Sequence, residues 1–334
     1  MVDPADTPKT PGEAPLEAHS KLTAGERIHF QVFEGRAEPV DPVPTAVVCP
    51  HEEGSLGGAL EAHDRDLIEP ILVGDPDAIR KAADSLGRSI DGFEIIERKS
   101  HAEAAATAVK LVHDQRVRCL MKGHIHTDDF LHPIVRRDGG LRTGRRLSHV
   151  FVADLPRHPR PLLITDAAIN ITPDLATKAD IVQNAIDLAM ALGIQVPKVA
   201  ILSAVETVNQ VIPSSVDAAI LAKMADRGQI KGGIVDGPFA MDNAIDAQAA
   251  ATKGLDSPVA GQAEVLVVPS IEAGNILLKG LTFLGGAESA GLVIGATVPI
   301  MLTSRADDDR ARAASAALAL LYDHWAKSRS VPLT

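Results

Sequence analysis

The amino-acid sequence predicts an α/β fold with mainly parallel sheets, divided into two domains. Short apolar runs alternate with amphipathic stretches along most of the 334 residues, and glycine or polar residues close the apolar runs. Strands that alternate with helices are joined by right-handed crossovers and therefore lie parallel. The composition, 46% hydrophobic and 23% charged, is typical of a globular protein long enough for two domains and a sizeable core.

The chain begins with a segment rich in proline, aspartate, threonine and glutamate, and we expect residues 1–19 to form a disordered tail. This segment has neither the basic nor the apolar region of a secretory signal. The first half of the chain then alternates strands and helices. Its predicted strands lie at 45–48, 68–73, 94–96 and 118–121, and its predicted helices at 57–66, 77–86 and 102–113.

A glycine- and arginine-rich passage at 139–149, GGLRTGRRLSH, interrupts the periodicity and marks the entry into a second domain. Beyond it the predicted strands lie at 150–152, 161–164, 198–202, 233–235, 265–268 and 292–294, and the predicted helices at 175–192, 214–227 and 275–284. We expect the alanine-rich helix at 310–327 to pack back onto the first domain. The first domain would then comprise residues 20–149 with 302–334 and the second residues 150–301, with strand ends from both lining a cleft.

The composition also excludes several classes of partner. A formal net charge of −11 argues against a nucleic-acid-binding protein, which normally presents a basic face. No apolar run approaches the roughly 20 residues of a membrane-spanning helix. Two cysteines, Cys49 and Cys119, cannot form a disulfide framework, and buried reduced thiols are the simpler interpretation. We therefore expect a soluble cytoplasmic protein with no nucleic-acid or membrane partner.

The stretch VPIMLTSRAD at 298–307 carries the strongest functional signal. Its apolar run predicts a buried strand at 298–302, which ends in a hydroxyl pair and a guanidinium, with a carboxylate close behind: Thr303, Ser304, Arg305 and Asp307. Ligands of open α/β sheets bind at the carboxyl ends of strands. Arginine also binds phosphate through two parallel hydrogen bonds. The alternative is that the two hydroxyl residues only cap the helix that follows.

Two further groups in the first half follow the same pattern. Lys122 and Gly123 end a strand, and Thr127 supplies a hydroxyl before a helix. Backbone amides at such a turn can bind an anion, although an ordinary turn and cap fits equally well. Arg142 and Thr143 lie in a glycine-flanked basic loop, for which a solvated surface is the usual outcome.

In the second half, Asn275 and Lys279 follow the apolar strand at 265–268 and lie one helical turn apart on the same face. An amide and an ammonium in that position can hold a phosphate or an acyl carbonyl, and Asn275 can equally be only a cap. Polar turns at 166–170 and 236–238 repeat the theme of polar strand ends.

Other chemistry has little support. His124 and His126 lack a third metal ligand at a recognisable spacing, so we predict no metal site. The sequence contains no GxxxxGK[ST] phosphate loop, no GxGxxG after the first strand and no GxSxG elbow. A covalent acyl-serine mechanism is therefore not expected.

The chain contains six long motifs: CLMKGHIHTDDFL, GGLRTGRRLSHVFV, ITDAAINITPDLATKADIVQNAI, GGIVDGPFAMDNAI, VLVVPSIEAGNILLKGLTFLGGA and VPIMLTSRAD. In this order they resemble the phosphate acyltransferase family, most closely its phosphate butyryltransferase type, with the phosphate acetyltransferase type more distant. The similarity runs from about residue 46 to residue 321. It is more specific than any single spacing in the chain.

The resemblance implies an architecture like that of the isocitrate/isopropylmalate dehydrogenases: two three-layer α/β/α domains, an active site in the cleft between them, and a homodimer. It implies the reaction acyl-CoA + phosphate = acyl phosphate + CoA, for a butyryl or acetyl group, by direct transfer in a ternary complex. CoA, inorganic phosphate and acyl phosphate would be the ligands, with no permanently bound cofactor.

The resemblance also implies roles for particular residues. Ser304 and Arg305 match the family's active-site pair, and Lys279 matches a lysine that faces the acyl phosphate. The cleft wall and linker loop correspond to Lys122, Gly123, Thr127, Arg142 and Thr143. Lys279 or Asn275 would stabilise the oxyanion, and Asp307 is the nearest base for the CoA thiol. Acetyl-type relatives carry their catalytic aspartate further along, where this chain has Ala311.

Two other functions remain open. One is a metal- and NAD-dependent hydroxy-acid dehydrogenase of the same architecture, which would need an acidic metal cluster and a nicotinamide site that the sequence does not show. The other is a catalytically silent CoA- or phosphate-binding regulator. The presence of Ser304, Arg305 and Lys279 argues against that second alternative.

Overall fold

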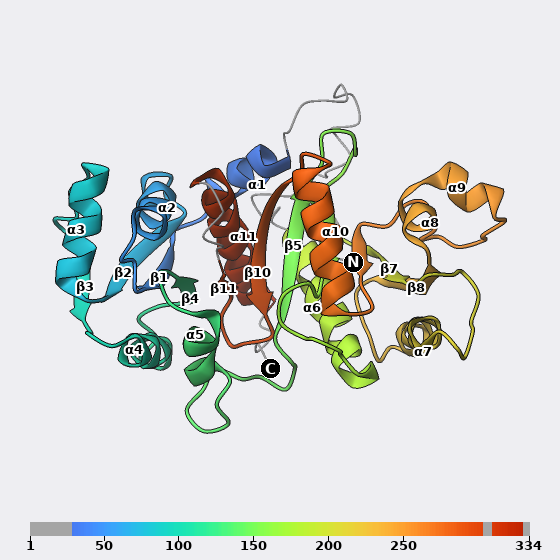
Figure 1. The fold of residues 1–334 in the computed structure, drawn as a ribbon, viewed down its shortest axis with the longest axis horizontal. Coiled ribbons are helices and arrows are strands. Elements are labelled where there is room, and N and C mark those ends of the chain that lie inside the picture. Colours follow the sequence, from blue (N-terminus) through green and yellow to red (C-terminus); the bar gives the residue numbers. More distant parts are fainter. Residues whose placement is uncertain (1–28, 303–308, 330–334) are drawn as a thin grey trace, which may run out of the picture.

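The computed structural model describes residues 29–302 and 309–329. The predicted tail and four candidate residues lie outside this part of the chain: residues 1–19, Thr303, Ser304, Arg305 and Asp307. The described residues form a mixed α/β structure in which helices cover both faces of one mostly parallel sheet (Figure 1). The predicted α/β class with mainly parallel strands is therefore confirmed, although one continuous sheet takes the place of the separate sheets expected for two domains.

The strands are β1 (Val43–Val48), β2 (Ile68–Gly74), β3 (Glu94–Glu97), β4 (Cys119–Lys122), β5 (Ser148–Asp154), β6 (Leu162–Thr165), β7 (Lys198–Leu202), β8 (Ile234–Phe239), β9 (Val265–Val267), β10 (Glu288–Ile294) and β11 (Ile300–Met301). The helices are α1 (His29–Ala37), α2 (Glu53–Asp64), α3 (Pro76–Leu86), α4 (His101–His113), α5 (Thr127–Ile134), α6 (Leu175–Ala191), α7 (Pro213–Asp226), α8 (Met241–Ile245), α9 (Ala247–Thr252), α10 (Ile271–Phe283) and α11 (Asp309–Ser328). Each of these strands overlaps a predicted one, whereas α1, α8 and α9 were not predicted.

The strand order is β3-β2-β1-β4-β11-β10-β5-β6-β9-β7-β8, so the sheet is continuous through the described chain. The strands β1, β2, β3, β4 and β11 are mutually parallel, and so are β6, β9, β7 and β8. Between these groups, β10 and β5 pair antiparallel with each other and with their outer neighbours. The two parallel groups therefore run in opposite directions, and the carboxyl ends of their strands point to opposite sides of the sheet.

The two faces of the sheet carry different cores. Val47 and Val152 join a single cluster that extends across both halves under α1, α2, α3, α6, α7 and α11. The next residues, Val48 and Ala153, point to the other face, because successive strand side chains alternate. There the core is divided into one cluster under α4 and α5 and another under α8, α9 and α10. The break between them lies at the centre of the sheet.

The C-terminal helix α11 packs against α1 and α2 of the first half and also against α6 and β10 (Figure 1). Packing on α1 and α2 agrees with the expectation that this helix returns to the first half of the chain. The division into residues 20–149 with 302–334 and residues 150–301 stays a prediction. Within residues 29–302 and 309–329, no helix has the length and apolar character needed to traverse a bilayer.

Candidate functional site

The turn after β4 is packed tightly against the end of β1. The Gly123 N–H donates to the carbonyl oxygen of Val48 at 2.8 Å. A Cβ atom on Gly123 would lie 2.4 Å from the carbonyl oxygen of Cys49 and 2.5 Å from that of Val48, so only glycine fits. Lys122 is buried, and its Nζ donates to the carbonyl oxygen of Gly123 at 3.3 Å. The predicted cation and glycine therefore have fixed positions at this strand end.

Thr127 is the first residue of α5 and is exposed. The residue in the N-cap position is His126, whose side chain makes no capping hydrogen bond. The Thr127 hydroxyl therefore lies at the open start of a helix, where unpaired backbone N–H groups favour an anion.

The end of β11 lies beside this turn. Met301 is paired with Met121 in the parallel β11–β4 ladder, so Leu302 leaves the sheet next to Lys122. The predicted strand at 298–302 is shorter than expected, with two residues in β11. Ser304, Arg305 and Asp307 lie beyond Leu302, outside the described residues, so their geometry stays a prediction.

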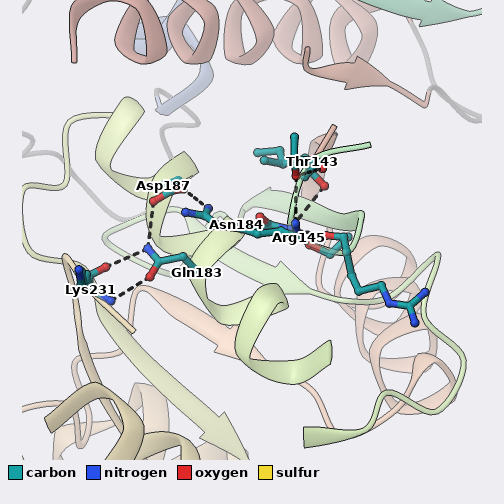
Figure 2. A network of polar contacts seen from close by, with 10 residues as sticks. Thr143, Arg145, Gln183, Asn184, Asp187 and Lys231 are labelled. Carbon is teal, nitrogen blue, oxygen red and sulfur yellow. Dashed lines mark hydrogen bonds and ion pairs between the residues drawn. The ribbon is translucent and has the colours of Figure 1, made fainter. Parts of the chain in front are cut away.

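The basic loop before β5 is held to the end of β10 (Figure 2). The Thr143 hydroxyl donates to the carbonyl oxygen of Gly295 at 2.7 Å and accepts the Arg145 N–H at 3.1 Å. The neighbouring residue, Arg142, forms an isolated antiparallel bridge with Ala296, while its side chain is exposed. Thr143 thus anchors the loop, and Arg142 is presented to solvent.

Side chains of α6 hold the other side of the loop, as Figure 2 shows. Arg145 forms an ion pair with Asp187, which also accepts Gln183 Nε2 at 3.0 Å. The Asn184 amide donates to the carbonyl oxygen of Arg146 at 3.0 Å. This network borders a pocket of about 290 Å³ between α6 and α11. The pocket lining does not include Lys122, Asn275 or Lys279, so it is separate from the other candidate residues.

The helix α10 begins four residues earlier than predicted. Its N-cap is Ser270, whose hydroxyl accepts the Ala273 N–H, so the alternative that Asn275 is only a cap is wrong. Asn275 and Lys279 are both exposed and lie one turn apart. The amide and the ammonium are therefore available on the same outer face of α10.

The turn at 166–170 connects α10 with the α5 side of the divided core. Asp166 is buried and its carboxylate accepts the N–H groups of Ala168, Ile169 and Asn170. Burial raises the pKa of Asp166, although these hydrogen bonds act in the opposite direction. Ile169 packs against the cluster under α5. The same turn meets α10, because a Cβ on Gly274 would lie 2.8 Å from the Cβ of Ala167.

His149 of β5 lies on the face of the sheet that carries the two separate clusters, and it was not among the predicted site residues. The residue is 1% exposed, and its ring lies 3.9 Å from the Phe151 ring, centroid to centroid. Gly291 of β10 leaves room for it, since a Cβ there would lie 2.4 Å from His149 Cε1. Burial lowers the pKa of His149 to about 3, so the imidazole is neutral near pH 7. Its Nδ1 has no hydrogen-bond partner among the described residues.

The described contacts thus assemble three parts. Lys122 and Gly123 lie beside the end of β11, the loop with Thr143 lies on the end of β10, and the turn at 166–170 lies on α10. The sequence could have indicated His149, because a histidine interrupts an otherwise apolar strand there.

Comparisons with known proteins show the family, and the more identical of the two relatives that follow is of the acetyl type, not of the butyryl type that the motifs predicted. Residues 96–320 match the family model described as "Phosphate acetyl/butaryl transferase". The chain is 56% identical over 291 residues to a phosphate acetyltransferase of Rhizobium meliloti, covering 87% of this chain and 92% of that protein. It is 42% identical over 293 residues to a phosphate butyryltransferase of Clostridium beijerinckii, covering 88% and 97%. A crystal structure of a branched-chain phosphotransacylase from Enterococcus faecalis V583 is similar, with a TM-score of 0.73, 31% identity, and coverage of 84% and 99%.

Proposed function

The chain belongs to the phosphate acetyl/butyryl transferase family, and we propose that it transfers a short acyl group directly between CoA and inorganic phosphate. The reaction is acyl-CoA + phosphate = acyl phosphate + CoA, and it is reversible. A hydroxy-acid dehydrogenase is not favoured, because the relatives at 42% and 56% identity are acyltransferases.

The observation that carries the proposal is the parallel pairing of β4 with β11. It brings the buried cation Lys122 next to the point where the chain continues into Ser304 and Arg305. Phosphate carries one or two negative charges near pH 7 and is bound best by several cationic donors at once. We assign phosphate binding to Arg305 and Ser304, with Lys122, Gly123 and Thr127 on the adjoining wall.

The acyl-CoA is assigned to the other side of the site. Lys279 and Asn275 on α10 would stabilise the oxyanion that forms when phosphate attacks the thioester carbonyl. Arg142, exposed on an anchored loop, suits the anionic part of CoA. Because the two substrates are bound together, their proximity supplies much of the rate and no covalent intermediate is needed.

In the reverse direction the CoA thiol must lose its proton, and the pKa of a comparable free cysteine thiol is about 8.5. We assign the base to Asp307. Ala311 lies in α11 and has no carboxylate, and its carbonyl oxygen accepts the Ser315 hydroxyl at 3.0 Å. Ala311 therefore cannot supply the base.

We also propose a cytoplasmic homodimer whose acyl transfer uses no permanently bound cofactor. Three apolar side chains on and after α10 support the dimer: Ile276, Phe283 and Leu284 are 72%, 76% and 91% exposed. Large apolar residues that gather on one helix and stay exposed often mark an interaction surface. Both cysteines, Cys49 and Cys119, are free and buried, in keeping with a reducing compartment.

The test is release of CoA thiol from acetyl-, propionyl-, butyryl- and isobutyryl-CoA, with and without inorganic phosphate. We expect release that requires phosphate, and the highest kcat/KM identifies the acyl group. If CoA binds but no acyl-CoA reacts, the silent regulator is the correct function. If neither CoA nor phosphate binds, the proposed function is wrong.

A further inference from the structure

A group of histidines and one cysteine lies where the order of the strands reverses, between β1 and β4. In the order β3-β2-β1-β4, the chain leaves β1 toward one side and β4 lies on the other. The helix that follows β1, α2, packs on the undivided core, whereas α5, which follows β4, packs on the opposite face. The connections after β1 and β4 therefore diverge, and such a crevice is a general ligand site of open α/β sheets.

Three potential metal ligands meet in this crevice. Cys49 follows β1 directly, His51 comes two residues later, and His101 is the first residue of α4. The Cys49 Sγ and one ring nitrogen from each histidine all lie within 4.8 Å of one another. Cys49 is fully buried and has a φ of 55°, a backbone conformation uncommon for a residue other than glycine. The fold thus holds a thiol at this point in spite of unfavourable backbone geometry.

A fourth residue borders the group. The His124 ring lies 6.4 Å from the His101 ring, centroid to centroid, and nearly perpendicular to it. His124 Nδ1 forms an ion pair with Glu52. His124 therefore borders the three potential ligands without belonging to their group.

The ligand types select the kind of metal. Thiolate and imidazole are soft to borderline ligands that suit Zn²⁺ and related transition-metal ions, whereas Mg²⁺ and Ca²⁺ prefer oxygen. Zinc binds cysteine sulfur at about 2.3 Å and histidine nitrogen at about 2.0–2.1 Å. The three ligand atoms, which lie within 4.8 Å of one another, would therefore move closer together around a shared ion.

His51 is the weakest of the three ligands. Its Nε2 accepts the Asp75 N–H at 3.0 Å, and ligation through either ring nitrogen would remove that hydrogen bond. Variants of Cys49 and His101, and not of His51, therefore give the decisive test of metal binding.

We propose that Cys49, His51 and His101 bind one divalent transition-metal ion of the Zn²⁺ type, with His124 next to it. The prediction of no metal site considered only His124 and His126, because spacing along the sequence does not reveal ligands that are some fifty residues apart. The proposal does not depend on the acyltransferase reaction, since its test measures metal binding.

The experiment uses the untagged full-length chain after chelator treatment, titrated with Co²⁺ as a spectroscopic probe and then with Zn²⁺. We expect one ion per chain, a thiolate-to-Co²⁺ absorption band, and displacement of Co²⁺ by Zn²⁺. Cys49→Ser should abolish the thiolate band. His101→Ala should weaken binding at least about tenfold.

His101 is only partly buried in the first turn of α4. His101→Ala should therefore fold normally, even in the case that Cys49→Ser disrupts the fold. The matched controls are His113→Ala, an exposed histidine at the other end of α4, and Cys119→Ser, the other buried thiol. Both controls should bind Co²⁺ as the wild type does. Absence of stoichiometric binding, or a Co²⁺ affinity unchanged in His101→Ala, would overturn the proposal.

Discussion

Met301 of β11 lies opposite Met121 of β4 in a parallel pair, although 179 residues separate them in the sequence. The pair brings Lys122, held by the tight turn at Gly123, to the strand end from which Ser304 and Arg305 continue. The candidate phosphate site therefore depends on a contact between two segments that lie far apart in the chain.

Removing the guanidinium of Arg305 should strongly impair phosphate use. We expect Arg305→Ala to lower kcat/KM for phosphate at least about a hundredfold, because a preorganised charged donor is lost. Arg305→Lys should recover only part of the activity, since an ammonium lacks the planar fork. Steady-state kinetics at varied phosphate concentration measures both variants.

The control for this prediction is Arg88→Ala, which removes an exposed arginine paired with Asp64. Its kcat/KM should match the wild type. A fully active Arg305→Ala enzyme with normal phosphate saturation would contradict the site assignment.

The substitution Gly123→Ala should destabilise the protein. The Cβ would meet two backbone oxygens at 2.4–2.5 Å, and overpacking of this kind costs about 1–3 kcal/mol of unfolding free energy. In contrast, Gly280→Ala in α10 meets no atom within 4 Å and should stabilise by about 0.4–1 kcal/mol. Urea midpoints of the two variants test the difference, and equal midpoints would show that the turn after β4 can move aside.

The buried His149 should make the protein sensitive to acid. Its pKa is about 3 in the folded chain and 6.5 when unperturbed, so the unfolded state binds more protons between these values. Stability from this group is therefore present above pH 6.5 and is lost progressively as the pH falls toward 3. His149→Leu should lose less unfolding free energy between pH 7 and pH 4 than the wild type does.

Denaturant titrations at several pH values measure this difference. His132→Leu, which changes a histidine outside the buried core, serves as the control and should keep the wild-type pH dependence. Parallel pH curves for wild type and His149→Leu would refute the prediction.

Loss of the Thr143 hydroxyl should loosen the basic loop. Thr143→Val removes the hydrogen bonds to the Gly295 carbonyl oxygen and the Arg145 N–H. Their loss should lower the free energy of unfolding by about 1 kcal/mol. We expect the KM for acyl-CoA to rise several-fold while kcat changes little, because Arg142 is no longer held in place. Thr207→Val, at an exposed position, should change neither value, and an unchanged KM in Thr143→Val would argue against a role of the loop in CoA binding.

Local patterns in the sequence predicted most of the elements and the candidate residues. Apolar runs closed by polar turns located each described strand, and Lys122 and Gly123 were recognised as a strand end. The same patterns could not reveal that β11 inserts between β4 and β10, because pairing between distant segments leaves no periodic signal. The start of α10 was misplaced at Asn275 because the capping residue Ser270 lies closer to the preceding strand than expected.

The late position of β11 has a consequence for synthesis on the ribosome. The strands β1 to β4 emerge first, but the edge of β4 stays without its neighbour until residue 300 has been made, 178 residues after Lys122. At about 5–20 residues per second, that wait is roughly 9–36 seconds. An unpaired strand edge can associate with other chains in that time, so the nascent protein should depend on chaperones or slow expression to reach high yield.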